Sequence, residues 1–255
     1  MQIKKNNRNL FLFWDGKERP ALIKLLHNII ANWSLNGKNF IPYVFNRVSI
    51  ENAILVPKQI DRFNWANQTD YYRTHLVAKY GGIWMDSDMI VMNDLSDLYD
   101  RIDNDGCFFI QEDHHHLSSG CFGAAAEHPA VVRWAEKTKK IVLSGSADEW
   151  GSLGPLALTE CRDEGLIDPS EIIFGPHNVY PILPGFCEAI FHSHYNNWPL
   201  ISREYQPFIT LVHHVVDKFD DDITIEEILQ KPIALTYFLH KTIQGVRKLH
   251  NIETE

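Results

Sequence analysis

Residues Thr69–Met92 have the sequence TDYYRTHLVAKYGGIWMDSDMIVM, whose pattern is the clearest indication of the fold in this chain. Its first half, Asp70–Tyr80, has apolar residues at helical spacing, and two glycines follow where a left-handed residue would end a helix. Ile83–Met85 is too short for a helix and is rich in strand-forming residues. We therefore expect a helix, a glycine stop and a short buried strand in succession.

Two aspartates follow this strand. Asp86 and Asp88 are two residues apart, so on an extended backbone both carboxylates would point to the same side. Carboxylates held so close repel each other unless a cation lies between them, and oxygen ligands suit Mg²⁺ or Mn²⁺. The sequence thus predicts a divalent-metal site that includes Asp86 and Asp88.

The whole block resembles the sugar-nucleotide site of retaining GT-A glycosyltransferases in the DXD-containing sugar-transferase family. That family includes yeast mannosyltransferases, α-galactosyltransferases and capsular polysaccharide transferases, and the clostridial glucosylating toxins carry a similar block. The resemblance implies an α/β, Rossmann-type GT-A fold with a central mixed sheet flanked by helices. It also implies metal-dependent transfer of a hexose from a nucleotide sugar, foremost a UDP-sugar, with retention of configuration.

The resemblance assigns catalytic or donor-binding roles to residues of the block. Asp70 and Arg73 are three residues apart, on one helical face, and would hold the sugar hydroxyls and diphosphate of the donor. Trp84, where tyrosine is commoner, would also lie at the donor. Asp86 would reach the ion or the ribose, and Asp88 would ligate the ion. Taken alone, Asp70 and Arg73 would be an ordinary ion pair on a helix surface.

Two further segments of the chain match the family more loosely. Leu10–Trp14 predicts a strand, after which a turn and a helix follow. The resemblance places Trp14 against the nucleotide base and the Gly16 backbone near the nucleotide; a core position is the alternative for Trp14. Gly154, followed by proline, resembles a family loop that precedes a helix near the donor phosphates. A helix N-terminus is also a physical site for anions. An ordinary helix start is the alternative there.

The third metal ligand is expected near the C-terminus. Phe208–His214 is an apolar strand that ends in two histidines, where relatives place a ligand. We expect His213 to complete the ligand set, with His214 as the alternate. Lys218 could supply positive charge to the diphosphate. Glu112–Ser119 is expected as a polar loop between two strands, and the resemblance makes Gln111, Glu112, Asp113 and Ser119 candidates for contacts with sugar hydroxyls.

Composition indicates an ordinary globular protein. The 255 residues are 45% hydrophobic and 22% charged, which suits one domain. We expect a nucleotide-sugar-binding half at 1–95, an acceptor and metal half at 96–222 and a helical segment at 223–255. The four cysteines have irregular spacing, so reduced buried thiols are expected.

The charge and the apolar runs limit the partners. A formal net charge of −9 argues against nonspecific binding to nucleic acid. No run approaches a membrane span, and the N-terminus is a poor signal peptide. We therefore expect a cytoplasmic enzyme that acts on a glycan, glycolipid or protein. The apolar face of a helix expected at Ile223–Leu249 either packs on the protein or contacts the inner membrane surface.

Two other functions use similar residues. A haloacid-dehalogenase-like, Mg²⁺-dependent phosphatase also has Asp-x-Asp after an apolar strand, but that motif normally follows the first strand of the chain. A Ca²⁺-dependent carbohydrate-binding module would explain carboxylates and aromatic residues, but not Asp70 and Arg73 at helical spacing. We therefore favour the transferase.

Overall fold

The computed structural model describes residues 2–15, 18–112, 115–146, 151–174, 189–191, 194, 208–211 and 224–250. The chain forms two compact units, each assembled from three segments. Unit 1 comprises Met1–Asp15, Pro42–Asp86 and Asp97–Phe174, and unit 2 comprises Gly16–Ile41, Ser87–Ser96 and Gly175–Glu255. The expected single domain, with halves that meet near residue 95, stays a prediction.

Unit 1 contains a mixed six-stranded sheet in the order β2-β1-β3-β6-β5-β7. β1 is parallel to β3, β6 is antiparallel to both β3 and β5, and β7 is parallel to β5. The strands are β1 Asn9–Phe13, β2 Ile41–Phe45, β3 Gly82–Met85, β5 Cys107–Gln111, β6 Leu117–Ala124 and β7 Ile172–Phe174. The prediction of an α/β fold with a central mixed sheet is therefore confirmed.

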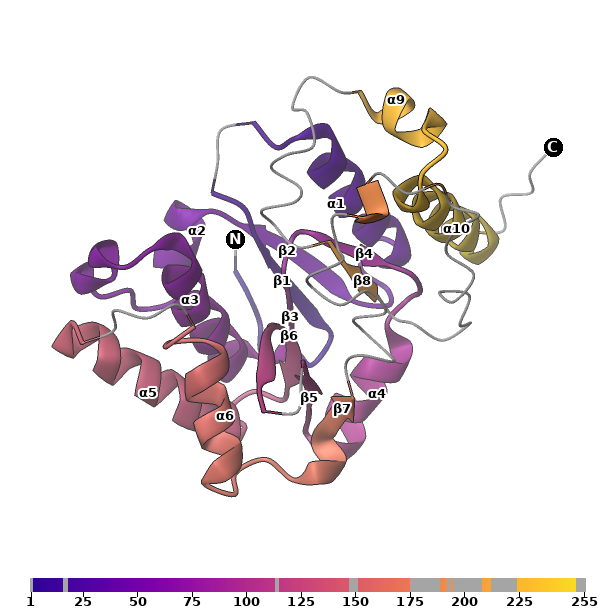
Figure 1. The fold of residues 1–255 in the computed structure, drawn as a ribbon. Coiled ribbons are helices and arrows are strands. Elements are labelled where there is room, and N and C mark those ends of the chain that lie inside the picture. The colour runs from indigo at the N-terminus through magenta and orange to yellow at the C-terminus, as the bar shows by residue number, and fades with distance from the viewer. Residues whose placement is uncertain are drawn as a thin grey trace. The chain divides into compact units, whose positions relative to one another are not determined.

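Helices accompany this sheet in unit 1. They are α2 Arg47–Ala53, the 3-10 helix η1 Lys58–Arg62, α3 Trp65–Tyr80, α4 Ser96–Asp105, α5 Pro129–Ser144, α6 Pro155–Asp163 and the 3-10 helix η2 Pro169–Glu171. α5 packs against both α3 and α6 (Figure 1). In this layer the Trp134 ring lies 4.9 Å from that of Phe122, and its Nε1 donates to the Leu153 carbonyl at 2.8 Å.

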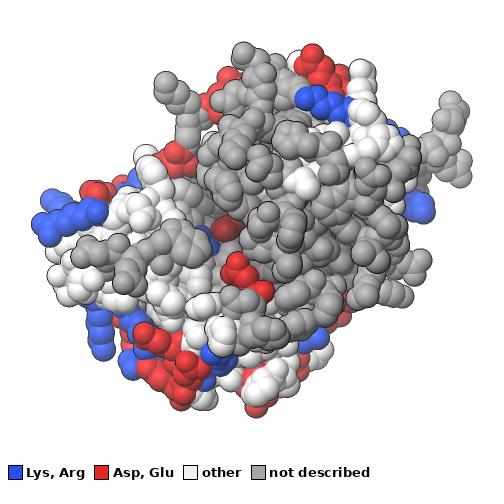
Figure 2. Space-filling model, in the orientation of Figure 1, with Lys and Arg blue, Asp and Glu red and all other residues white. Residues whose placement is uncertain are grey.

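The outer surface of α5 and α6 is covered by ion pairs. Arg133 pairs with Glu164 at 3.1 Å, and Lys137 pairs with both Glu160 and Glu164 at 2.7 Å. Figure 2 shows acidic and basic side chains mingled where these two helices lie in Figure 1. Exposed pairs of this kind contribute little to stability, so the buried layer beneath them holds the two helices together.

Unit 2 contains a small antiparallel pair, β4 Met89–Val91 with β8 Phe208–Thr210, and the helices α1 Ala21–Trp33, α9 Ile225–Gln230 and α10 Ala234–Leu249. Trp33 joins three of these elements, because its Nε1 donates to the Val91 carbonyl at 3.2 Å and to Thr242 Oγ1 at 2.9 Å. A Cβ on Gly245 would come within 2.8 Å of the Trp33 ring. The glycine therefore allows α10 to approach α1 closely.

The structure corrects two expectations from the sequence. The single helix expected at Ile223–Leu249 is two helices, because Pro232 cannot donate a backbone hydrogen bond and the helix stops before it. The loop expected at Glu112–Ser119 is shorter, because β6 begins at Leu117 and pairs with β5. The apolar side of α10 packs on α1 and β4, as one of the two alternatives for it predicted. No helix in the described part of the chain is long and apolar enough to cross a membrane.

Candidate active site

The helix α3 and the strand β3 are joined by a tight turn that glycine makes possible. Gly81 has a φ of +69° and Gly82 a φ of +114°, both in the region that favours glycine. A Cβ on Gly82 would also overlap the backbone of Asn9 in β1. These two glycines let β3 pair closely with β1 and fix where β3 begins, and the strand ends at Met85, directly before Asp86.

Arg73 joins two carboxylates within unit 1. Its Nε lies 3.3 Å from Asp70 Oδ1 and its Nη2 lies 3.3 Å from Asp86 Oδ1. The Arg73 and Asp70 side chains are buried, whereas the Asp86 side chain is 33% exposed. An arginine buried between two carboxylates differs from a surface ion pair, which was the alternative at the level of sequence. The structure therefore brings Asp70, Arg73 and Asp86 into one cluster.

Two buried residues, Trp84 and Ser119, contact this cluster and orient its side chains. The Trp84 side chain is fully buried, its ring lies 5.2 Å from the Arg73 guanidinium carbon, and its Nε1 donates to Asp86 Oδ1 at 2.9 Å. The Ser119 carbonyl accepts from Arg73 Nη1 at 2.5 Å, and its hydroxyl donates to Asp70 Oδ1 at 3.1 Å. Trp84 thus supports Asp86 and Arg73 from within the core.

Ser119 was only a weak candidate from the sequence. A serine in a short polar segment carries no periodic signal, and its contact with Asp70 spans 49 positions of the chain. Only the pairing of β6 with β3, which places Cys121 opposite Met85, brings this part of β6 beside the cluster. A sequence pattern that covers Thr69–Met92 alone could not reveal it.

Burial raises the pKa of Asp70 from 3.8 to about 6. The Arg73 charge and the Ser119 hydrogen bond lower this pKa, and the Asp86 charge raises it further. Asp70 is therefore a carboxyl group that changes protonation close to neutral pH. A group of this kind can hold a sugar hydroxyl either as an acceptor or as a donor.

Gly154 is the residue before α6, and its Cα lies against the Asp70 carboxylate. A Cβ at this position would come within 2.6 Å of Asp70 Oδ1. Any other residue would push the carboxylate away from Arg73, so the glycine is required by the close approach. The structure thus links Gly154, which the sequence predicts near the donor, to Asp70 in the same cluster.

The segment between the two aspartates is a turn. Asp86 is the last residue of a unit 1 segment, and its backbone N–H donates to the Gly120 carbonyl at 2.9 Å. Ser87 and Asp88 form the turn and belong to unit 2. Asp88 is buried, and its backbone carbonyl accepts from the Leu211 N–H at 2.9 Å. The expectation of an extended backbone from Asp86 to Asp88 is therefore wrong, and the shared metal site of the two aspartates stays a prediction.

The Asp86 carboxylate is suited to ligate a divalent metal ion. The two contacts described above both use Oδ1, which leaves Oδ2 as the oxygen that could ligate a divalent ion. The partial exposure of its side chain allows access, and carboxylate oxygen is a ligand that Mn²⁺ and Mg²⁺ accept. His213 and His214 lie outside the described residues, so the predicted third ligand stays a prediction.

The remaining predicted donor residues are distributed as follows. Trp14 is half-buried directly after β1, and its backbone N–H donates to the Phe45 carbonyl at 2.8 Å. Gly16 and Lys218 lie outside the described residues. The donor-binding roles of Trp14, Gly16 and Lys218 therefore stay predictions.

Known proteins show where this chain belongs. The family described as "Capsular polysaccharide synthesis protein" matches residues 1–131. A human protein named alpha-1,4-N-acetylglucosaminyltransferase is 26% identical over 165 residues, which are 52% of this chain and 45% of that protein. The chain therefore spans about half the length of this curated relative. These similarities confirm the resemblance to sugar transferases that the sequence motifs indicate.

Two solved glycosyltransferase structures match this chain at low sequence identity. The PaToxG glycosyltransferase is 11% identical, with a TM-score of 0.44 over 96% of this chain and 88% of that chain. The apo-form glycosyltransferase GlyE of Streptococcus pneumoniae TIGR4 is 12% identical, with a TM-score of 0.48 over 98% of this chain and 64% of that chain.

Proposed function

This chain belongs to the capsular polysaccharide synthesis protein family, and we propose that it is a metal-dependent glycosyltransferase. It would move a hexose from a nucleotide sugar, foremost a UDP-sugar, to a glycan, glycolipid or protein acceptor with retention of configuration. The observation that carries this proposal is the arginine between Asp70 and Asp86 at the end of β3. The name of the human relative makes an N-acetylhexosamine the first donor sugar to test.

The diphosphate leaving group gains negative charge as the glycosidic bond breaks, and the site must neutralise that charge. A Mn²⁺ or Mg²⁺ ion held by Asp86, Asp88 and His213 would supply this as a Lewis acid. Asp86 is oriented for the purpose, because Trp84 and Arg73 both hold its Oδ1. The sequence positions of Trp14, Gly16 and Lys218 suit contacts with the base and the diphosphate.

Asp70 would hold the sugar of the donor. Its carboxyl group is kept in place by Arg73 and by the Ser119 hydroxyl, and Gly154 leaves the space that it occupies. A carboxyl whose pKa lies at about 6 can orient one sugar hydroxyl firmly by a charge-assisted hydrogen bond. Such orientation is a large part of how transferases lower the barrier to reaction.

Hydrolysis of donors without any acceptor tests this function. Purified protein would be incubated with Mn²⁺ and a panel of UDP- and GDP-sugars, with UDP-N-acetylglucosamine first, and the released nucleoside diphosphate would be measured. We expect hydrolysis of one donor, and its loss in Asp88→Asn. Asp97→Asn serves as the matched control, because Asp97 is an exposed aspartate in the first turn of α4.

Two results would contradict the proposal. Hydrolysis that persists unchanged in Asp88→Asn would remove the metal site from the reaction. Failure of the protein to bind any UDP- or GDP-sugar in the presence of Mn²⁺ would exclude the transferase. Mg²⁺-dependent hydrolysis of p-nitrophenyl phosphate would instead favour a phosphatase. The anomeric configuration of the released sugar, followed by NMR, would test retention.

A further inference from the structure

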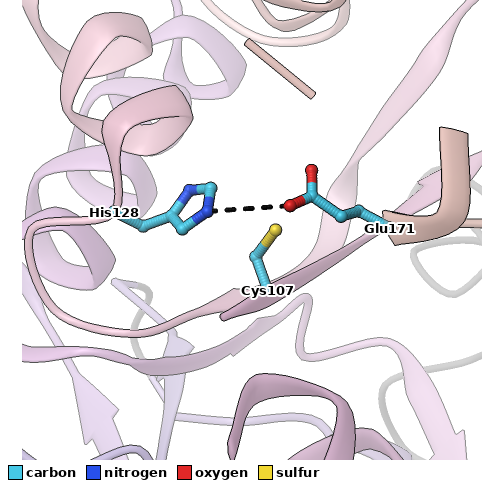
Figure 3. Close-up of side chains that lie close together, drawn as sticks. All are labelled: Cys107, His128 and Glu171. Atoms are coloured by element: carbon cyan, nitrogen blue, oxygen red, sulfur yellow. Dashed lines mark ion pairs between the residues drawn. The ribbon is translucent and has the colours of Figure 1, made fainter. Parts of the chain in front are cut away.

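A second cluster of chemically active side chains lies in unit 1. Cys107 is the first residue of β5, His128 is the residue before α5, and Glu171 is the last residue of η2. One ligand atom from each lies within 4.8 Å of the other two, and His128 Nε2 is 3.9 Å from Glu171 Oε1. Figure 3 shows the three side chains pointing toward one another from three separate segments.

This cluster is distinct from the candidate active site. β3 and β5 run in the same direction, because each is antiparallel to β6, and β7 is parallel to β5. Asp86 follows the carboxyl end of β3, whereas the cluster lies at the amino ends of β5 and β7. The two groups therefore lie at opposite edges of the same sheet, and an ion at the cluster could not take part in transfer at Asp86.

The cluster is buried, and within it the Cys107 thiol and the Glu171 side chain are hydrogen-bonded. Cys107 is fully buried, and the side chains of His128 and Glu171 are only 14% and 15% exposed. Within the described part of the chain, the buried His128 Nδ1 has no hydrogen-bond partner. Nε2 is the ring nitrogen that faces Glu171, so Nε2 and not Nδ1 would be the metal ligand.

The cluster is also unsuited to act as a nucleophile. Burial, with the Glu171 charge next, raises the pKa of the Cys107 thiol well above its ordinary value. A thiol that stays protonated reacts slowly, since the thiolate is the nucleophile. Burial lowers the pKa of His128, which the Glu171 charge opposes. Neutral imidazole is the form of histidine that binds metals.

We propose that Cys107, His128 and Glu171 bind one thiophilic divalent ion, foremost Zn²⁺. Sulfur, imidazole nitrogen and carboxylate oxygen form a mixed ligand set that suits Zn²⁺, whereas Mg²⁺ and Ca²⁺ prefer oxygen alone. With metal–ligand distances of about 2.0–2.3 Å, tetrahedral ligand atoms lie roughly 3–4 Å apart. The three atoms are thus close to a binding arrangement, and water would occupy the fourth position.

Binding is balanced in charge and protons. The Cys107 thiol gives its proton to the buffer as the sulfur–metal bond forms, so that a thiolate and a carboxylate neutralise the two charges of the ion. The ion would tie together β5, the start of α5 and the segment before β7. We therefore expect Zn²⁺ to stabilise the folded protein without being needed for the transfer reaction.

Cobalt serves as the spectroscopic probe. Tag-free protein freed of metal by a chelator would be titrated with Co²⁺, in wild type and in an Asp86→Asn/Asp88→Asn background that lacks the proposed donor ion. We expect a thiolate-to-cobalt absorption band in the near ultraviolet that saturates at one equivalent in both. Cys107→Ala should lose the band, and Cys161→Ala, which changes a buried cysteine outside the cluster, should keep it. A wild type with no such band, or a Cys107→Ala variant that keeps it, would overturn the proposal.

A second variant keeps the test valid if Cys107→Ala does not fold. Glu171→Gln retains the shape of the side chain and removes its charge, and we expect Co²⁺ and Zn²⁺ affinity to fall by about tenfold or more. Zn²⁺ should raise the melting temperature of wild type and of Cys161→Ala more than that of Glu171→Gln. Equal affinity and equal thermal shifts in all three proteins would show that the cluster does not bind the ion.

Discussion

Replacing Arg73 with methionine tests whether this arginine holds the candidate active site together. In the wild type it pairs with Asp70 and Asp86 at 3.3 Å each and donates to the Ser119 carbonyl. Methionine replaces the aliphatic part of the arginine side chain but has no charge and no donor. The variant therefore leaves the buried Asp70 carboxylate without its counter-charge, while most of the packing volume is kept.

The structure sets the size and the pH dependence of this effect. Breaking a buried ion pair costs about 3–5 kcal/mol, and we expect about 3 kcal/mol because Asp86 is partly exposed to water. The pKa of Asp70, about 6 in the wild type, rises further without the lowering effect of Arg73. Below that pKa the folded state carries a neutral carboxyl, whereas above it a buried charge is unpaired. The destabilisation should therefore be larger at pH 8 than at pH 5.

Urea unfolding at pH 5 and pH 8 measures this difference. Arg133→Met is the matched control, because Arg133 also pairs with two carboxylates, Glu136 and Glu164, but on the surface. It should cost less than about 1 kcal/mol at either pH. The role assigned to Arg73 would be refuted if Arg73→Met lowered the free energy of unfolding equally at both pH values. It would also be refuted if this decrease matched that of Arg133→Met.

Three further variants test other parts of the structure. Trp84→Phe removes the hydrogen bond to Asp86 and should lower kcat for donor hydrolysis by about tenfold. An unchanged kcat would show that Trp84 does not hold Asp86 in place for the reaction. Gly154→Ala displaces the Asp70 carboxylate and should raise KM for the donor, and a wild-type KM would contradict the close approach. Burial lowers the pKa of His27 from 6.5 to about 4, so between these pH values the unfolded chain binds the extra proton. As the pH falls from 6.5 to 4, the wild type should lose about 3 kcal/mol more unfolding free energy than His27→Gln, and identical pH profiles would exclude this.

The parts of the fold that depend on local pattern could be predicted. The apolar runs at Leu10–Trp14 and Ile83–Met85 correspond to β1 and β3, because a short apolar run bounded by turn residues is typical of a buried strand. The end of the helix at Gly81 was recognisable because two glycines follow its last apolar residue, and the structure gives both a positive φ. The pairing of Asp70 with Arg73 also follows from helical spacing alone.

What the sequence could not predict depends on contacts between distant segments. Ser119 was expected in a loop, and only the pairing of β6 with β5 and β3 makes it part of a strand beside Asp70. The turn at Ser87 was missed because two aspartates in an apolar context resemble a continuing strand. The Cys107 cluster joins three segments with no motif in common.

We propose that Asp86 and a divalent ion together hold the diphosphate of a nucleotide sugar. Calorimetric titration of UDP into the protein, with and without Mn²⁺, tests it most directly because no acceptor or turnover is needed. We predict binding that requires Mn²⁺, is lost in Asp86→Asn and persists in Asp97→Asn. Binding of UDP that is equally strong without metal, or that survives in Asp86→Asn, would show that Asp86 does not hold a metal ion at the diphosphate.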